Sequence, residues 1–159
     1  MIQFKLLLSS LQAQGVSFVI IGGVAATLHG SARVTFDLDV VYDRSPENLE
    51  RLVRALAPFQ PYLRGAPPGL PFRFDAETLK RGLNFTFTTT EGPIDLLGEL
   101  AGVGSFPEVF ANSVSAQLFG AEYRFLDLEA LIASKRAAGR PKDFEAIAEL
   151  ETIRQERKG

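Results

Sequence analysis

Two aspartates, set two residues apart in an apolar run, are the residues of this sequence best suited to chemistry. Asp37 and Asp39 lie within residues 34–41, whose alternating pattern predicts a strand. Because residues i and i+2 of a strand share a face, we expect both carboxylates to point the same way, with Thr35 beside them. Like charges this close repel, and hard cations prefer carboxylate oxygens. The pair therefore predicts a Mg²⁺ or Mn²⁺ site, the alternative being a half-exposed strand with a wet face.

A third carboxylate, Asp95, is expected on a neighbouring strand. The apolar runs 83–90 and 93–97 are separated by two residues, which predicts a tight hairpin. In the expected register Thr88 lies opposite Asp95, and the hairpin has one polar and one apolar face. Asp95 would then complete the metal site, next to the nucleophile of a transfer reaction. An ordinary exposed position is the alternative reading.

Gly22 and Gly23 interrupt the chain between a predicted buried strand, 16–21, and a short helix. Glycines let a ligand approach the backbone, and a helix N-terminus favours an anion, so the pair is a candidate phosphate site. A tight strand-to-helix turn without a ligand is the alternative, since neither the Rossmann nor the Walker pattern is present. Arg33 and Thr35 lead into the aspartate strand, where they would contact phosphate or hold the aspartates.

Lys135 lies on the apolar stripe of a helix predicted over 128–138. A lysine in such a position either extends to solvent or reaches a buried anion. Arg136, Arg140 and Lys142 follow closely, so a phosphate-facing cluster is one interpretation. The other is a solvated helix end whose cations are favoured by the helix dipole.

Length and composition exclude several classes of protein. The 159 residues, 46% of them apolar, suffice for one domain over 1–159 with a real core. The chain has no cysteine and a single histidine, so thiolate and histidine-cluster metal sites are excluded. A net charge of −2 argues against a broadly basic nucleic-acid binder. Without a signal pattern or a long apolar run, a cytoplasmic protein is expected.

Helical and strand patterns alternate early and then give way to a hairpin, which predicts an α/β (α+β) fold with a mixed β-sheet and flanking helices. Residues 57–71 hold five of the nine prolines and are expected to be a loop. The remaining expected elements are helices at 3–14, 46–56 and 76–81, a short strand at 72–75, a β element at 114–126, and a last helix opened by Pro141 with Phe144, Ile147, Leu150 and Ile153 as its apolar stripe.

These motifs together resemble a known family. The string from Ile20 through Gly22-Gly23 to Asp37-Leu38-Asp39 resembles the signature of the DNA polymerase β-type nucleotidyltransferase superfamily. It is similar in more detail to small bacterial nucleotidyltransferase-like proteins, including the toxin nucleotidyltransferases of abortive-infection toxin–antitoxin systems. Residues 131–143 resemble their C-terminal motif, in which the lysine faces the nucleotide phosphates. The resemblance spans about residues 16–145, with helices over 127–157 completing the nucleotide cleft.

The resemblance implies transfer of a nucleoside monophosphate from an NTP such as ATP to a hydroxyl of an RNA (for example tRNA), a protein or a small molecule. Asp37 and Asp39 would bind Mg²⁺ or Mn²⁺, Asp95 would assist the acceptor, and an antitoxin would be a partner. The alternative is a catalytically silent nucleotide-binding or protein-interaction module on the same fold. With the residues named above, the expected nucleotide contacts are Gly22, Gly23, Arg33, Thr35, Lys135 and Arg136.

Overall fold

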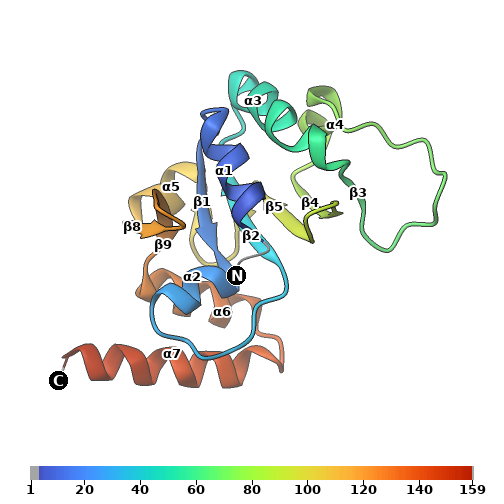
Figure 1. The fold of residues 1–159 in the computed structure, drawn as a ribbon. Helices are drawn as coiled ribbons and strands as arrows, with labels where there is room; N and C mark the ends of the chain where they lie inside the picture. The colour runs from blue at the N-terminus through green and yellow to red at the C-terminus, as the bar shows by residue number, and fades with distance from the viewer. Residues whose placement is uncertain (1–3, 159) are drawn as a thin grey trace.

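A seven-stranded mixed sheet runs through the centre of the protein (Figure 1). The computed structural model describes residues 4–158. β2 is parallel to β5 and β1 is parallel to β9, whereas the other neighbouring pairs are antiparallel. A two-stranded ribbon, β6 (Glu99–Leu100) with β7 (Gly104–Ser105), lies apart from it. Across the large sheet the strands are β3 (Tyr62–Leu63), β4 (Asn84–Thr88), β5 (Ile94–Leu97), β2 (Leu38–Tyr42), β1 (Phe18–Ile21), β9 (Ala121–Leu126) and β8 (Ser113–Leu118).

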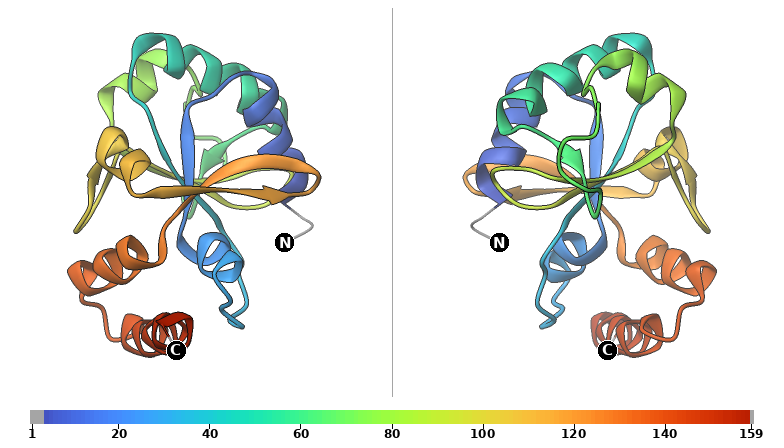
Figure 2. Two further views of the ribbon diagram at one scale, coloured as in Figure 1. Left: turned by 90° about the vertical axis from the view of Figure 1, so that its left-hand side faces the viewer. Right: turned by 90° about the vertical axis from the view of Figure 1, so that its right-hand side faces the viewer.

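Helices flank this sheet, so the predicted mixed α/β architecture is confirmed. Figure 2 shows α1, α3 and α4 on one side of the sheet and α2, α6 and α7 on the other. None of the described helices is long and apolar enough to cross a membrane. The helices are α1 (Lys5–Ala13), α2 (Gly22–Leu28), α3 (Pro46–Leu56), α4 (Ala76–Arg81), α5 (Phe106–Ala111), α6 (Leu128–Ala138) and α7 (Asp143–Lys158).

Side-chain caps fix the starts of α3 and α6. The Ser45 side chain accepts a hydrogen bond from the backbone N–H of Asn48 at the start of α3. At the start of α6 the Asp127 carboxylate accepts from the N–H of Ala130. Gly139 then ends α6 in the left-handed conformation, at φ +62°. The boundaries predicted for α3 and α6 are confirmed.

The strand that carries the aspartates is shorter than predicted. β2 begins at Leu38, so the predicted strand at 34–37 is wrong and Asp37 lies in a bend just before β2. β1 ends at Ile21, where the chain turns into α2, so backbone partners for residues before Leu38 are missing on that side. Without a sheet to cover them, Val34 and Phe36 are 76% and 73% exposed.

The hairpin of β4 and β5 is present, but its register differs from the expected one by two residues. Thr86, not Thr88, lies opposite Asp95. The turn is still two residues long, but it is Thr90-Glu91, because Thr89 and Gly92 exchange both backbone hydrogen bonds. In the predicted register Pro93 would have faced Thr90 at a position that requires an N–H donor, which proline lacks. Because the side-chain period of a strand is two, the slip leaves the polar and apolar faces unchanged.

Two apolar segments depart from their predicted patterns. Residues 72–75 are not a strand: the rings of Phe72 and Phe74 contact Phe87, while the backbone lies in the loop that projects from the body (Figure 1). The alternation therefore reflects two anchored rings and not a paired strand. In α7, Phe144 is 63% exposed, so the predicted stripe is wrong at that position.

Candidate active site

Strand register brings two of the carboxylates together. Asp39 on β2 lies directly opposite Asp95 on β5, and Ile21 pairs with Asp39 from the other side. In a parallel pair, residues that face each other project to the same side of the sheet. Asp37 joins them from the bend before β2, and one carboxylate oxygen from each residue lies within 4.8 Å of the others. The structure thus assembles all three carboxylates that the sequence singled out.

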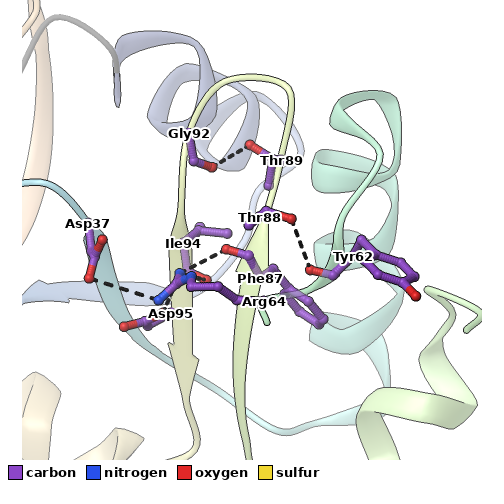
Figure 3. Close-up of polar contacts among 9 residues, drawn as sticks. All are labelled: Asp37, Tyr62, Arg64, Phe87, Thr88, Thr89, Gly92, Ile94 and Asp95. Atoms are coloured by element: carbon purple, nitrogen blue, oxygen red, sulfur yellow. Dashed lines mark hydrogen bonds and ion pairs between the residues drawn. The ribbon is translucent and has the colours of Figure 1, made fainter. Parts of the chain in front are cut away.

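Arg64 is a site residue that sequence reasoning missed. Its Nη2 lies 2.7 Å from Asp95 Oδ1, and its Nη1 lies 3.9 Å from Asp37 Oδ2 (Figure 3). Nη2 donates a hydrogen bond to the carbonyl of Phe87 at 2.8 Å. Arg64 follows β3 directly, and its backbone N–H donates to the carbonyl of Thr86. The edge strand β3 therefore delivers a cation to the carboxylates.

The three acids disturb one another. Burial raises the pKa of Asp39 to about 8, helped by hydrogen bonding and repulsion from Asp95 and by the charge of Asp37. Lys135 opposes this rise in the pKa only weakly. When no cation is bound, this raised pKa favours the protonated form of Asp39 at neutral pH.

The carboxylate oxygens fit a divalent cation. Asp39 Oδ1 and Asp95 Oδ1 are buried, and neither accepts a hydrogen bond from any residue between 4 and 158. The guanidinium of Arg64 is close to Asp95 Oδ1, but its Nη2 donates to backbone carbonyls. Among the described residues, Asp39 Oδ1 has no such cation beside it, and a buried acceptor without a partner costs free energy. Mg²⁺ and Mn²⁺ bind such oxygens and complete their shells with water and phosphate.

Gly22 and Gly23 make room for the site. Gly22 has φ +62°, and a Cβ added there would lie 2.2 Å from Asp39 Oδ2. A Cβ on Gly23 would lie 2.8 Å from the hydroxyl oxygen of Thr35. Both positions need glycine because the backbone passes so close to these side chains. This steric role holds with or without phosphate, whose binding at this turn stays a prediction.

Cations from α6 and from the loop that follows it face the carboxylates. Lys135 is half-buried, with its side chain 23% exposed, and its Nζ lies 3.8 Å from Asp143 Oδ1. The Asp143 side chain is only 3% exposed. Arg140 Nε donates to Asp143 Oδ2 at 2.9 Å, and this bond holds the pKa of Asp143 below its usual range. The internal anion that Lys135 reaches is therefore Asp143.

Arg33 and Arg136 lie in different places. Arg33 lines the cleft beside Thr35, with its guanidinium 3.7 Å from Glu145. Arg136 lines neither of the cavities around the carboxylates, and its Nη2 pairs with Glu151 at 2.5 Å. Consecutive residues of a helix point about 100° apart, so Lys135 and Arg136 cannot both face the cleft. The structure does not bring Arg136 together with the other predicted residues.

Two adjoining cavities, of about 420 and 340 Å³, meet at the carboxylates. Both are lined by Asp39, Asp95, Lys135 and Arg140. The larger cavity has mainly apolar walls, and the smaller one is rich in cations. Leu97, Leu100, Leu131 and Ala138 are among the residues of the larger cavity, and Arg33, Thr35, Asp37 and Lys142 are among those of the smaller one.

The sequence from residue 2 to residue 156 matches the model of the family described as "Nucleotidyltransferase of unknown function (DUF6036)". The chain belongs to this family. The architecture is also similar to that of a "putative nucleotidyltransferase" from Thermotoga maritima (TM1012), with a TM-score of 0.53. That likeness covers 99% of this chain and 91% of the other at 13% identity, and it shows the fold alone. No curated protein matches the chain in sequence.

In this nucleotidyltransferase-family chain, sequence analysis did not find the site residues whose contacts depend on strand pairing or helix packing. Arg64 sits in a proline-rich segment, and only the pairing of β3 with β4 carries it to Asp95. Asp143 follows Pro141 at the start of α7, and only the packing of α7 against α6 buries it beside Lys135. Neither residue type nor local spacing distinguishes these positions from ordinary surface charges.

Proposed function

We propose that this protein transfers a nucleoside monophosphate from an NTP to a hydroxyl group of an acceptor and releases pyrophosphate. Asp37, Asp39 and Asp95 would hold Mg²⁺ or Mn²⁺. The single observation that carries this proposal is the convergence of three carboxylates, with two buried oxygens that accept no hydrogen bond from the described residues. A silent module has no need of three repelling acids, so this cluster favours the enzyme.

The roles of the carboxylates follow from their positions. A bound Mg²⁺ or Mn²⁺ would neutralise phosphate charge and lower the pKa of the attacking hydroxyl. Asp95 borders the larger cavity and is assigned to the acceptor, whose hydroxyl it would orient and deprotonate. Asp37 borders only the smaller, cationic cavity and is assigned to the triphosphate side.

The cations of the smaller cavity would bind the triphosphate. Lys135, Arg33 and Thr35 are the predicted contacts, and Arg140 and Lys142 now join them because they line the same cavity. Ammonium and guanidinium groups form charge-assisted hydrogen bonds to phosphate oxygens. Because Arg140 and Lys135 already pair with Asp143, nucleotide would share or displace that carboxylate.

We also infer that the chain belongs to the DNA polymerase β-type superfamily, on the Gly-Gly and Asp-x-Asp motifs and their placement around one cleft. The resemblance to abortive-infection toxins supports a toxin role with an antitoxin partner. Growth arrest on expression in a bacterial host, absent with Asp39→Asn, is the expected result. Equal growth with both forms would remove the toxin assignment and leave the enzyme proposal standing.

The decisive experiment measures pyrophosphate release and transfer of label from each of the four NTPs. Acceptors are bulk RNA, cell protein and a small-molecule extract, with Mg²⁺, Mn²⁺ or a chelator. We expect metal-dependent transfer to one acceptor class, with Asp95→Asn reducing kcat far more than nucleotide affinity. Asp43→Asn is the matched control, since Asp43 follows β2 at its other end. Nucleotide binding without transfer to any acceptor would establish the silent module instead.

A further inference from the structure

Arg64 is held in place by the backbone and not by the carboxylates alone. Its Nη2 donates to the carbonyl of Phe87 at 2.8 Å and to that of Ile94 at 3.4 Å. Its own N–H donates to the carbonyl of Thr86 at 3.0 Å. With a side chain 29% exposed, the guanidinium is largely withdrawn from water. A ligand that displaced Arg64 from Asp95 would leave these carbonyl bonds intact, so the positive charge would stay beside the site.

The atoms that Arg64 approaches are the ones a divalent cation needs. Asp95 Oδ1 is 2.7 Å from Nη2 and accepts no hydrogen bond from the described residues, and Asp37 Oδ2 is 3.9 Å from Nη1 (Figure 3). A metal ion binding Asp95 Oδ1 would lie close to a fixed guanidinium. Like charges at that range repel strongly where water is scarce. The arginine and the cation therefore compete for the same carboxylate charge.

We propose that Arg64 is a resident counter-ion of the carboxylate cluster, which keeps Asp37 and Asp95 together in the metal-free protein and weakens the binding of a divalent cation when no nucleotide is present. The inference rests on the proposed function, because it takes these carboxylates as the metal site. Arg64 is thus a positioning residue that acts through the two aspartates. The test must separate this role from simple support of the fold.

The experiment titrates nucleotide-free protein with Mn²⁺ and follows free Mn²⁺ by electron paramagnetic resonance. Arg64→Met removes the charge and keeps much of the side-chain volume, and Arg64→Lys keeps the charge. We expect Arg64→Met to bind Mn²⁺ about tenfold more tightly or better, given like-charge repulsion at a partly buried site. Arg64→Lys should stay within roughly threefold of the wild type. Arg154→Met should match the wild type, because Arg154 is an ion-paired arginine of similar exposure on α7.

Melting temperatures give an independent readout. Without metal, Arg64→Met should melt below the wild type, because Asp37 and Asp95 lose their cation, and saturating Mn²⁺ should remove that difference. If Arg64→Met folds only with Mn²⁺, that result also supports the proposal. If it folds under neither condition, Arg64→Gln decides, since its amide can still donate to the Phe87 carbonyl and its charge is absent.

The outcomes separate the two proposals. Wild-type binding of Mn²⁺ with unchanged or weaker binding by the charge-removing variants would overturn the role of Arg64 and leave the metal site intact. Absence of Mn²⁺ binding to every form at millimolar concentration would overturn both. Tighter binding by Arg64→Met and near-wild-type binding by Arg64→Lys is the pair of results that a merely structural arginine cannot produce.

Discussion

Asp39 and Asp143 face one cleft from opposite walls, and their surroundings move the two carboxyl groups in opposite directions. On the sheet wall, burial and two neighbouring acids raise the pKa of Asp39 to about 8. On the helical wall, hydrogen bonds from Arg140 and the charge of Lys135 lower the pKa of Asp143. The two residues have the same side chain, so their neighbours account for the whole difference.

The difference separates a sheet wall with excess negative charge from a helical wall whose charges are already paired. On the sheet wall, backbone pairing of Asp39 with Asp95 prevents the carboxylates from moving apart, and Arg64 pairs with Asp95 and Asp37 there. On the helical wall, Lys135 and Arg140 are already paired with Asp143. Under the proposed function, the sheet wall would take the divalent cation, and a phosphate at the helical wall would have to compete with the Asp143 carboxylate.

Asp39→Asn should have the largest effect: it should lower transfer activity and, without metal at pH 8, raise the melting temperature. Transfer activity should fall by roughly two to three orders of magnitude, the cost of removing one preorganised electrostatic group. The raised pKa of Asp39 means that the folded protein binds more protons than the unfolded chain, so stability is lost as pH rises towards 8. In a chelator at pH 8, the variant should thus melt above the wild type. A lower melting temperature there would contradict the expectation that the charged Asp39 carboxylate destabilises the metal-free protein.

Gly22→Ala should come next, because a Cβ would lie 2.2 Å from Asp39 Oδ2. Gly120→Ala is the matched control: Gly120 has φ +78°, but nothing lies within 4 Å of an added Cβ. Both changes carry the left-handed backbone penalty of about 1–2 kcal/mol. We expect urea unfolding to show a further loss of stability for Gly22→Ala and weaker Mn²⁺ binding for that variant alone. Equal losses would mean that the close approach does not matter.

Lys135→Met tests the helical wall. We expect at least about tenfold weaker NTP binding, or ~1.4 kcal/mol, because a cation facing the smaller cavity is lost. Arg136→Met changes the next residue, which pairs with Glu151 outside the cleft, and should alter nucleotide affinity by less than about twofold. Calorimetric titration of both variants measures this contrast. Similar losses in both would indicate a diffuse charge effect and no directed contact.

Asp143→Asn should have the smallest effect, a pH-dependent loss of thermal stability. Because the pKa of Asp143 is lowered on folding, its contribution is present above pH ~4 and is lost as pH falls through the folded-state pKa. At pH 7 the variant should melt about 2–4 °C lower, corresponding to roughly 1 kcal/mol. The gap to the wild type should close on acidification. A gap that does not narrow at all between pH 5 and pH 3 would assign the loss to packing and not to charge.

Local pattern was enough to predict much of this molecule. Caps at Ser45 and Asp127, the mixed α/β architecture, and the choice of Asp37, Asp39 and Asp95 all follow from residue type and spacing. Each depends on contacts over a few residues or on alternation along one strand. The roles of the three acids in metal binding and catalysis stay predictions.

What the sequence could not supply is pairing between distant segments. The end of β1 decides where β2 begins, and Pro93 shifts the hairpin by two residues. Arg64 reaches Asp95 only through an edge strand of two residues, which is too short to leave a pattern. The directions in which Lys135 and Arg136 point depend on their separate partners in α7, which reach them only because α7 packs against α6.

The in-register pairing of Asp39 with Asp95 also has a consequence for biosynthesis. β2 and β5 are neighbours in the sheet, but α3, β3, α4 and β4 lie between them in the chain. A nascent polypeptide that has emerged only as far as β4 carries Asp37 and Asp39 without their partner. Assembly of the carboxylates therefore depends on a nonlocal strand pairing, and fragments that end before β5 cannot hold the complete site.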